Sequence, residues 1–292
     1  MTEQKKVAFI GLGVMGYPMA GHLVTNGYDV TVFNRTEDKA QRWVKEFNGK
    51  KVNTPREAAE NAEFVFCCVG NDDDLRKVTL QEDGIFAGMK QDAIMVDHTT
   101  TSAEVARELY QEGTSKGFHF LDAPVSGGQA GAEQGILTVM VGGDEPVFDR
   151  ASDSMSSYGR AVTLMGESGA GQLTKMVNQI CIAGLVQALA EGLNFAQKAG
   201  LNGEQVVQVI SKGAAQSWQM ENRGNTMVRN EFDFGFAVDW MRKDLGICLD
   251  EANRNGANLP ITAIVDQFYK EVQALGGNRA DTSSLMMRLN RN

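Results

Sequence analysis

Hydrophobic and polar residues follow two different patterns along this chain. In the first part, short apolar runs rich in Val, Ile and Phe alternate with amphipathic stretches of helical length. Such runs, bounded by Gly, Asp or Asn, are typical of strands, and their alternation with helices is typical of parallel strands joined by crossover helices. The predicted strands lie within residues 6–13, 28–34, 62–70, 93–99, 117–124 and 136–143, and helices are expected within 35–47, 54–62 and 102–117.

No convincing alternating strand pattern occurs after residue 169, where long helical segments take over. The first of them, 170–200, is apolar on nearly every face, which is typical of a buried helix that two domains pack against. We therefore predict an α/β fold. A doubly wound Rossmann domain should span residues 1–166, and an all-α C-terminal domain for substrate binding and oligomerisation should span 167–292, joined by a long interdomain helix.

Composition and charge narrow the class of protein. The net charge of -9 at pH 7 argues against a nucleic-acid partner, because phosphate neutralisation needs clustered Lys and Arg. The apolar run after the charged N-terminus is too short for a signal peptide or a membrane span, and the four cysteines lack metal-ligand spacing. We expect a cytoplasmic protein with reduced thiols, no membrane partner and no metal.

A glycine pattern follows the first predicted strand and opens the first helix. Gly11, Gly13 and Gly16 form G-x-G-x-x-G, which in this context is the dinucleotide-binding fingerprint. The first glycine permits a tight turn, the second lets the backbone approach a pyrophosphate, and the third brings the helix near the strand. The alternative is a tight turn with no ligand. The predicted cofactor-binding residues here are Gly11, Leu12, Gly13, Val14, Met15 and Gly16.

The end of the second predicted strand bears on the choice of nucleotide. An acidic residue there would bind the ribose 2′-hydroxyl of NAD, but this chain has Asn34, Arg35 and Thr36. Arg35 could pair with a 2′-phosphate and Thr36 could donate to it, which favours NADP over NAD. Alternatively, Arg35 is a solvated residue at the start of a helix or stacks on adenine.

Four motifs together resemble the β-hydroxyacid dehydrogenase family. They lie at residues 7–23, 122–128 ("DAPVSGG"), 169–179 ("GAGQLTKMVNQ") and 241–246 ("MRKDLG"). The family includes 3-hydroxyisobutyrate dehydrogenases and the reductases of tartronate, succinic and glyoxylic semialdehydes. The resemblance implies hydride transfer between C4 of a nicotinamide and the carbonyl carbon of a small acid.

The resemblance also assigns residues to the reaction. Lys175 aligns with the catalytic lysine, which protonates the forming alkoxide or accepts the proton of the alcohol. Asn178, three residues on, would share its helix face and orient the same oxygen. The alternative for Lys175 is a surface lysine, although an ammonium in an apolar helix is costly unless it lines a cavity. The alternative for Asn178 is a buried amide that bonds to backbone.

The substrate loop and a second lysine follow from the same resemblance. Ser126, Gly127 and Gly128 are expected to bind the substrate carboxylate, because a side chain at either glycine would stand between the backbone amides and the ligand. Lys243 resembles the family's second active-site lysine, which reaches the cofactor or the substrate.

Two strand ends complete the predicted cofactor site. The resemblance places a hydroxyl near the nicotinamide ribose at Thr99 or Thr100, of which we favour Thr100, and we also assign Val69 to the cofactor. His98 lacks a partner motif, and we interpret it as structural.

The predicted function is therefore that of an NAD(P)-dependent oxidoreductase acting on a small carboxylate. A 3-hydroxy acid like 3-hydroxyisobutyrate or serine is favoured, and a short semialdehyde (tartronate, glyoxylic or succinic) reduced by NADPH is the alternative. A third reading is a catalytically silent nucleotide-binding protein. The apolar C-terminal helices favour a homodimer or homotetramer over a monomer.

Overall fold

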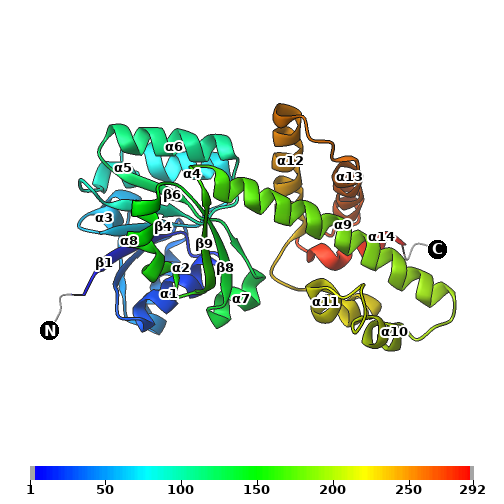
Figure 1. The fold of residues 1–292 in the computed structure, drawn as a ribbon. Coiled ribbons are helices and arrows are strands. Elements are labelled where there is room, and N and C mark those ends of the chain that lie inside the picture. The colour runs from blue at the N-terminus through cyan, green and yellow to red at the C-terminus, as the bar shows by residue number, and fades with distance from the viewer. Residues whose placement is uncertain (1–3, 290–292) are drawn as a thin grey trace. The chain divides into compact units, whose positions relative to one another are not determined.

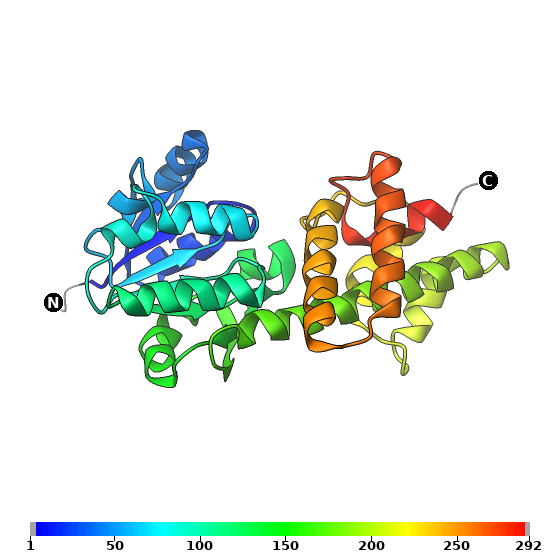
Figure 2. The same ribbon diagram turned by 90° about the horizontal axis from the view of Figure 1, so that it is seen from above.

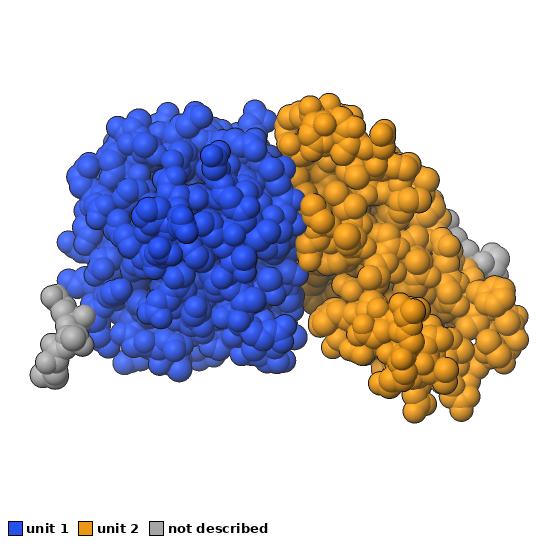
Figure 3. Space-filling view, in the orientation of Figure 1, with its two compact units in different colours: residues 1–175 blue, residues 176–292 orange. Residues whose placement is uncertain are grey.

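The computed structural model describes residues 4–289 and divides into two compact units, Met1–Lys175 and Met176–Asn292 (Figure 3). The division falls inside helix α9 (Ala170–Lys198), whereas the sequence predicted a boundary between residues 166 and 167. The first turn of α9 therefore belongs to unit 1.

Unit 1 alternates strands and helices along the chain (Figure 1). All six predicted strands are present, as β1, β2, β4, β5, β6 and β8, and three further strands, β3, β7 and β9, join them. The elements are β1 (Lys6–Ile10), α1 (Gly16–Thr25), β2 (Asp29–Phe33), α2 (Glu37–Phe47), β3 (Lys50–Lys51), α3 (Pro55–Ala59), β4 (Phe64–Cys67), α4 (Asp72–Leu80), α5 (Ile85–Gly88), β5 (Ile94–Asp97), α6 (Ala103–Ser115), β6 (His119–Asp122), β7 (Val125–Ser126), α7 (Gly128–Gln134), β8 (Leu137–Gly142), α8 (Glu145–Met155) and β9 (Gly159–Gly166).

The sheet has the order β3-β2-β1-β4-β5-β6-β8-β7, with β9 paired to β8. Strands β1 to β6 pair in parallel, as expected of a Rossmann domain. β8 departs from this parallel pattern, because it runs antiparallel to both β6 and β7. For the β7–β8 pair the reason is the short connection over residues 127–136, because a parallel pair needs a crossover of a dozen or more residues.

Helices cover both faces of this sheet and enclose two separate cores. On one face Phe9 and Phe66 pack with Met19 of α1 and Trp43 of α2. On the other face the alternate strand positions, such as Ile10, pack with helices α3 to α6. Because successive strand side chains point to opposite faces, one set of apolar strands fills both cores.

Unit 2 is helical and has a core of its own. Its residues Leu193 of α9, Met241 of α12, Tyr269 of α13 and Leu285 of α14 are buried in one cluster. Helices α12 and α13 lie side by side, joined by a four-residue connection (Figure 2). The remaining elements are α9 (Ala170–Lys198), α10 (Gly203–Ile210), α11 (Trp218–Val228), α12 (Val238–Asn255), α13 (Pro260–Ala274), the 3-10 helix η1 (Thr282–Ser284) and α14 (Leu285–Leu289).

Within residues 4–289, α9 is the one helix whose length and composition would allow it to cross a membrane. Its most apolar 18-residue window has a mean hydropathy of 1.3 and is 44% buried. The central helix of a globular protein has the same properties, and α9 buries the polar side chains of Gln172, Lys175 and Gln179.

Candidate active site

The glycine loop follows β1 and leads into α1. Gly11 has φ 95°, a left-handed value that L side chains rarely adopt, and its amide donates to the Phe33 carbonyl at 2.9 Å. A Cβ on Gly16 would lie 2.0 Å from the Gly11 carbonyl oxygen, whereas nothing lies within 4 Å of a Cβ built on Gly13. Protein atoms therefore fill the space beside Gly16, whereas the space beside Gly13 is open. Of the predicted residues between the glycines, Leu12 is buried, Met15 half-buried and Val14 exposed.

The residues after β2 have separate roles. The Asn34 side chain accepts from the Leu12 amide at 2.9 Å and donates to the Thr36 carbonyl at 2.9 Å, so it holds the glycine loop. Arg35 is 90% exposed and lies 3.8 Å from Asp74 of α4. Thr36 is the N-cap residue of α2 and is exposed. Arg35 and Thr36 are thus accessible to a ligand, while Asn34 is engaged with backbone.

The end of β5 positions the loop after β4. The Thr99 hydroxyl accepts from the Val69 amide at 3.0 Å, and the Thr99 amide donates to Asp97 Oδ1 at 3.1 Å. Thr99 is buried and Thr100 is half-buried. The Thr99 hydroxyl therefore holds the loop after β4, and the assignment of Thr100 to the cofactor stays a prediction.

The predicted substrate loop begins as a strand and continues as a helix. Ser126 pairs with Thr138 in the β7–β8 ladder, and α7 begins at Gly128. The sequence did not predict this short helix, because its glycine content is unusual for one. Gly127 has φ 139° and Gly128 has φ 62°, so both positions require glycine. Nothing lies within 4 Å of a Cβ built on Gly128, which leaves its backbone accessible.

Asp122, the last residue of β6, holds the start of α9. Its Oδ1 accepts from the Gly169 amide at 2.7 Å and its Oδ2 accepts from the Gln172 amide at 2.9 Å. The first amides of a helix have no partner within the helix, and a carboxylate satisfies them and stabilises the helix dipole. Burial raises the pKa of Asp122, while these amide hydrogen bonds lower it.

Gln172 joins the same helix to the loop after β5. Its side chain donates to the Thr99 carbonyl at 2.7 Å and accepts from the Thr101 amide at 3.1 Å. Lys175 follows three residues later and is 7% exposed. The predicted catalytic lysine is therefore one turn beyond a helix start that is anchored to two strand ends.

Unit 2 connects two further predicted residues through hydrogen bonds. Asn178 donates to Gln179 at 2.7 Å, and Gln179 in turn donates to Asp244 Oδ2 at 2.6 Å. The Lys243 ammonium lies 3.0 Å from Asp244 Oδ1 and 5.9 Å from the centre of the Trp240 ring. Asp244 thereby links the predicted amide on α9 to the predicted lysine on α12.

Sequence reasoning missed the residues that position the others, namely Asp122, Gln172 and Gln179. Each acts over a long separation in sequence, 47 residues between Asp122 and Gly169 and 73 between Gln172 and Thr99. The only signal in the sequence was a polar residue within a motif, such as Gln172 in "GAGQLTK". Such a residue does not identify its hydrogen-bond partner.

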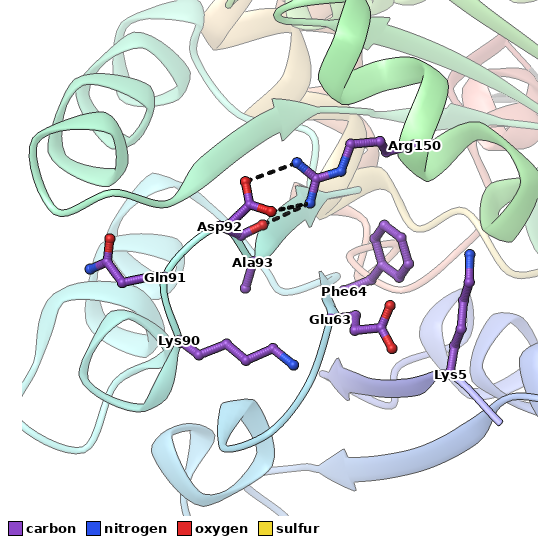
Figure 4. Close-up of a pocket in the computed structure, with 8 residues that line it drawn as sticks. All are labelled: Lys5, Glu63, Phe64, Lys90, Gln91, Asp92, Ala93 and Arg150. Atoms are coloured by element: carbon purple, nitrogen blue, oxygen red, sulfur yellow. Dashed lines mark hydrogen bonds and ion pairs between the residues drawn. The ribbon is translucent and has the colours of Figure 1, made fainter. Parts of the chain in front are cut away.

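A recess of about 340 Å³ lies at the other edge of the sheet (Figure 4). Residues at the starts of β4 and β5 line it, and there Arg150 forms an ion pair with Asp92. The predicted cofactor residues of unit 1 follow the carboxyl ends of β1, β2, β4 and β5, so this recess is separate from them. Residues 4–289 contain no group of three or more His, Cys, Asp or Glu side chains that could hold a metal ion.

Asp97 is the most perturbed acid near the predicted cofactor residues. It is fully buried, and burial raises its pKa to about 7 against the lowering effect of the Thr99 hydrogen bonds. Among the described residues, its Oδ2 has no hydrogen-bond partner. An acid in this setting favours its neutral form.

Family models match both parts of the chain. Residues 6–166 match the model described as the NAD binding domain of 6-phosphogluconate dehydrogenase. Residues 169–289 match the model described as NAD-binding of NADP-dependent 3-hydroxyisobutyrate dehydrogenase.

Individual relatives match over almost the full length. An uncharacterized oxidoreductase of Shewanella frigidimarina is 66% identical, over 97% of this chain and 98% of its own. The 2-hydroxy-3-oxopropionate reductase of Escherichia coli is 34% identical, over 97% of each chain. A solved structure of Mycobacterium tuberculosis 3-hydroxyisobutyrate dehydrogenase with L-serine has a TM-score of 0.89 and 29% identity, over 99% of this chain and 100% of that one.

Replacement of the acid that holds α9 should destabilise the protein. Asp122→Asn keeps one acceptor oxygen, so one buried amide, of Gly169 or Gln172, loses its partner. The free energy of unfolding should fall by about 1–3 kcal/mol in urea titrations. Asp149→Asn is the control, because Asp149 is exposed on α8 and its replacement should change this free energy by about 0.5 kcal/mol or less. Equal effects of the two substitutions would contradict the assignment.

The Asp97 carboxyl group should make the free energy of unfolding decrease as the pH rises. Its folded pKa lies above its ordinary value, so the folded protein keeps a proton that the unfolded chain releases. This contribution is complete below about pH 4 and is lost as the pH rises through 7, at roughly 1.4 kcal/mol per pH unit.

Urea unfolding of the wild type and Asp97→Asn between about pH 5 and pH 8 isolates this contribution. The free energy of unfolding of the wild type minus that of Asp97→Asn should decrease as the pH rises and should level off above the pKa of Asp97. Burial lowers the pKa of His98 to about 4, an effect of opposite sign that cancels in the difference. A difference that does not change with pH would contradict the prediction.

Proposed function

Because the chain belongs to the β-hydroxyacid dehydrogenase family of NAD(P)-dependent oxidoreductases, we propose that it transfers a hydride between the nicotinamide and a small 3-hydroxy acid. The proposed substrates resemble 3-hydroxyisobutyrate or serine. The relative of known structure, which was solved with L-serine, supports an acid of this size.

The proposal gives each residue at the site a chemical role. The glycine loop fits a pyrophosphate, because it is open above Gly13, and the bound nicotinamide accepts or supplies the hydride. Ser126 and the backbone of Gly127 and Gly128 bind the substrate carboxylate. Lys175 moves the proton to or from the substrate oxygen, and Asn178 donates a hydrogen bond to that oxygen.

One observation carries this proposal. Asp122 begins the motif that ends in Ser126, Gly127 and Gly128, and its carboxylate also binds the amides of Gly169 and Gln172 just before Lys175. A single buried side chain thus joins the predicted carboxylate-binding loop to the predicted acid–base helix. Catalysis by positioned groups depends on such fixed geometry.

The second candidate is the reduction of a short semialdehyde, such as tartronate, glyoxylic or succinic semialdehyde. It is favoured by the similarity to 2-hydroxy-3-oxopropionate reductase, which covers nearly all of both chains. The same residues would serve, with Lys175 as the proton donor. A catalytically silent nucleotide-binding protein is disfavoured, because Lys175 and the Ser126–Gly128 loop are both present.

For the cofactor, we propose that NADP is preferred over NAD. Arg35 is 90% exposed at the end of β2, next to Thr36, and no acid stands at residues 34–36 to bind a ribose 2′-hydroxyl. The ion pair with Asp74 at 3.8 Å is long and exposed, so a 2′-phosphate could replace it.

Homo-oligomerisation and a cytoplasmic location stay predictions. Exposed apolar side chains on α9 and α13 of unit 2, among them Val177, Phe195 and Ile261, support association with a second copy. Sedimentation velocity measures the oligomeric state directly.

The Lys175→Ala variant tests the reaction. We expect a spectrophotometric screen at about 340 nm, against 3-hydroxy acids and short semialdehydes, to find a substrate for the wild type. The variant should lose at least about a hundredfold in kcat, the lower range for one acid–base group, and keep its cofactor affinity. Lys198→Ala, at the far end of the same helix, should retain kcat. Near-normal turnover by the Lys175 variant would overturn the mechanism.

The Arg35→Ala variant tests the cofactor. It should raise the Kd for NADP by about tenfold or more and leave the Kd for NAD within about twofold, because only NADP offers a 2′-phosphate. The exposed Arg42 of α2 provides the matched control, and Arg42→Ala should change neither constant. Calorimetric titration measures all four affinities. Equal loss of both nucleotides would argue for adenine stacking instead.

A further inference from the structure

His98 and Tyr158 form a buried pair next to the end of β5. His98 directly follows β5 and is 2% exposed, and Tyr158 lies just before β9 and is fully buried. The imidazole Nε2 lies 2.7 Å from the Tyr158 hydroxyl. The imidazole also stacks on Phe66, with ring centres 6.0 Å apart and planes 2° apart. The ring is therefore fixed in position by its packing and by its hydrogen bonds.

The partners of the imidazole determine which nitrogen carries the proton. Nδ1 lies 2.6 Å from the Ala123 carbonyl oxygen, which can only accept, so Nδ1 is the donor. Burial lowers the pKa of His98 to about 4, and the neutral ring has one N–H. Nε2 then accepts from the Tyr158 hydroxyl. Burial raises the pKa of Tyr158 well above its ordinary value, which keeps that hydroxyl protonated.

Ala123 lies between β6 and β7, where the chain passes from the parallel ladder with β5 to the antiparallel ladder with β8. Its amide donates to the Asp97 carbonyl at 2.7 Å, as the last bond of the parallel ladder, and its carbonyl accepts from His98. Just after Ala123, the Pro124 carbonyl accepts from the Met140 amide at 3.1 Å, and Val125 and Ser126 pair with β8. Pro124 has no amide hydrogen to donate. The imidazole therefore fixes the peptide from which residues 124–128 depart.

We infer that His98 is a positioning residue for the substrate loop, and that the Tyr158 hydroxyl holds its imidazole in the tautomer that donates to Ala123. The orientation of the Ala123–Pro124 peptide sets the course of the chain toward Ser126, three residues on. The identification of residues 126–128 as the substrate loop rests on the proposed function, whereas the positioning itself concerns the conformation of the loop.

Two substitutions of His98 separate its two hydrogen bonds. The amide nitrogen of Asn can take the place of Nδ1, so His98→Asn can still donate to Ala123 but loses Tyr158. The amide nitrogen of Gln reaches the place of Nε2, so His98→Gln keeps a contact with Tyr158 and loses Ala123. Tyr158→Phe keeps the aromatic packing and removes the hydroxyl that fixes the tautomer.

Hydrogen exchange of the backbone, measured by mass spectrometry without substrate, gives the first readout. We expect peptides covering residues 125–131 to exchange about tenfold faster in His98→Gln and in Tyr158→Phe than in the wild type, since one buried hydrogen bond is lost or weakened. The His98→Asn variant should stay near the wild type. Peptides from β1 should exchange alike in all four proteins. Equal exchange in the Asn and Gln variants, or faster exchange throughout unit 1, would overturn the inference.

Kinetics and NMR give two further readouts. In His98→Gln the KM for the acid found in the screen should rise about tenfold while the KM for the cofactor stays within about twofold. Since the chain has only three histidines, ¹⁵N spectra of labelled imidazoles can be assigned with the His98→Asn variant, and His98 should show a protonated Nδ1. A protonated Nε2 would overturn the assignment. If no substrate is found, the proposed function fails, and exchange and tautomer still decide the role of His98.

Discussion

The hydrogen bonds from the Asp122 carboxylate to the first amides of α9 are the contact on which the rest of the site depends. They join the end of β6 to the start of α9, and the end of β8 pairs with the same aspartate through Gly142. The geometry leaves no room for side chains around the carboxylate, because a Cβ on Gly142 would lie 2.5 Å from Oδ1 and a Cβ on Gly171 would lie 2.8 Å from Oδ2 of Asp122. Lys175 can stand at a fixed place because the helix start that carries it is fixed.

The same arrangement recurs along the carboxyl edge of the sheet. Asn34 binds the glycine loop, Thr99 binds the loop after β4, and His98 binds the chain after β6. Each uses a side chain at the end of a parallel strand to satisfy backbone that has left the ladder, where an unpaired buried group would be costly. The residues predicted to touch ligands therefore rest on a set of polar residues that need not touch them.

The fold could be predicted where the decisive signal was local. Apolar runs and the glycine pattern identified the strands and the phosphate loop, because strand and turn preferences act over a few residues. The antiparallel direction of β8 depends on how separate segments pair, which composition does not show, and the glycine content of α7 pointed away from a helix. Asp122 and Gln172 were visible as residues but their partners were not, since a hydrogen bond over 47 or 73 residues leaves no spacing pattern in one sequence. His98 was interpreted as structural, and its contact with Ala123 could only be found from coordinates.

Asp97 shows what such an arrangement costs. Asp97 is fully buried, one of its oxygens has no hydrogen-bond partner within residues 4–289, and its pKa is raised to about 7, so it is a poor choice for stability alone. Its other oxygen, however, binds the Thr99 amide, and Thr99 in turn holds the Val69 amide beside the predicted cofactor site. An apolar residue at this position would remove the burial penalty and release that loop. The acid at the end of β5 is therefore explained by its role in holding the loop and not by a contribution to the stability of the fold. This is expected where stability and function place different demands on one residue.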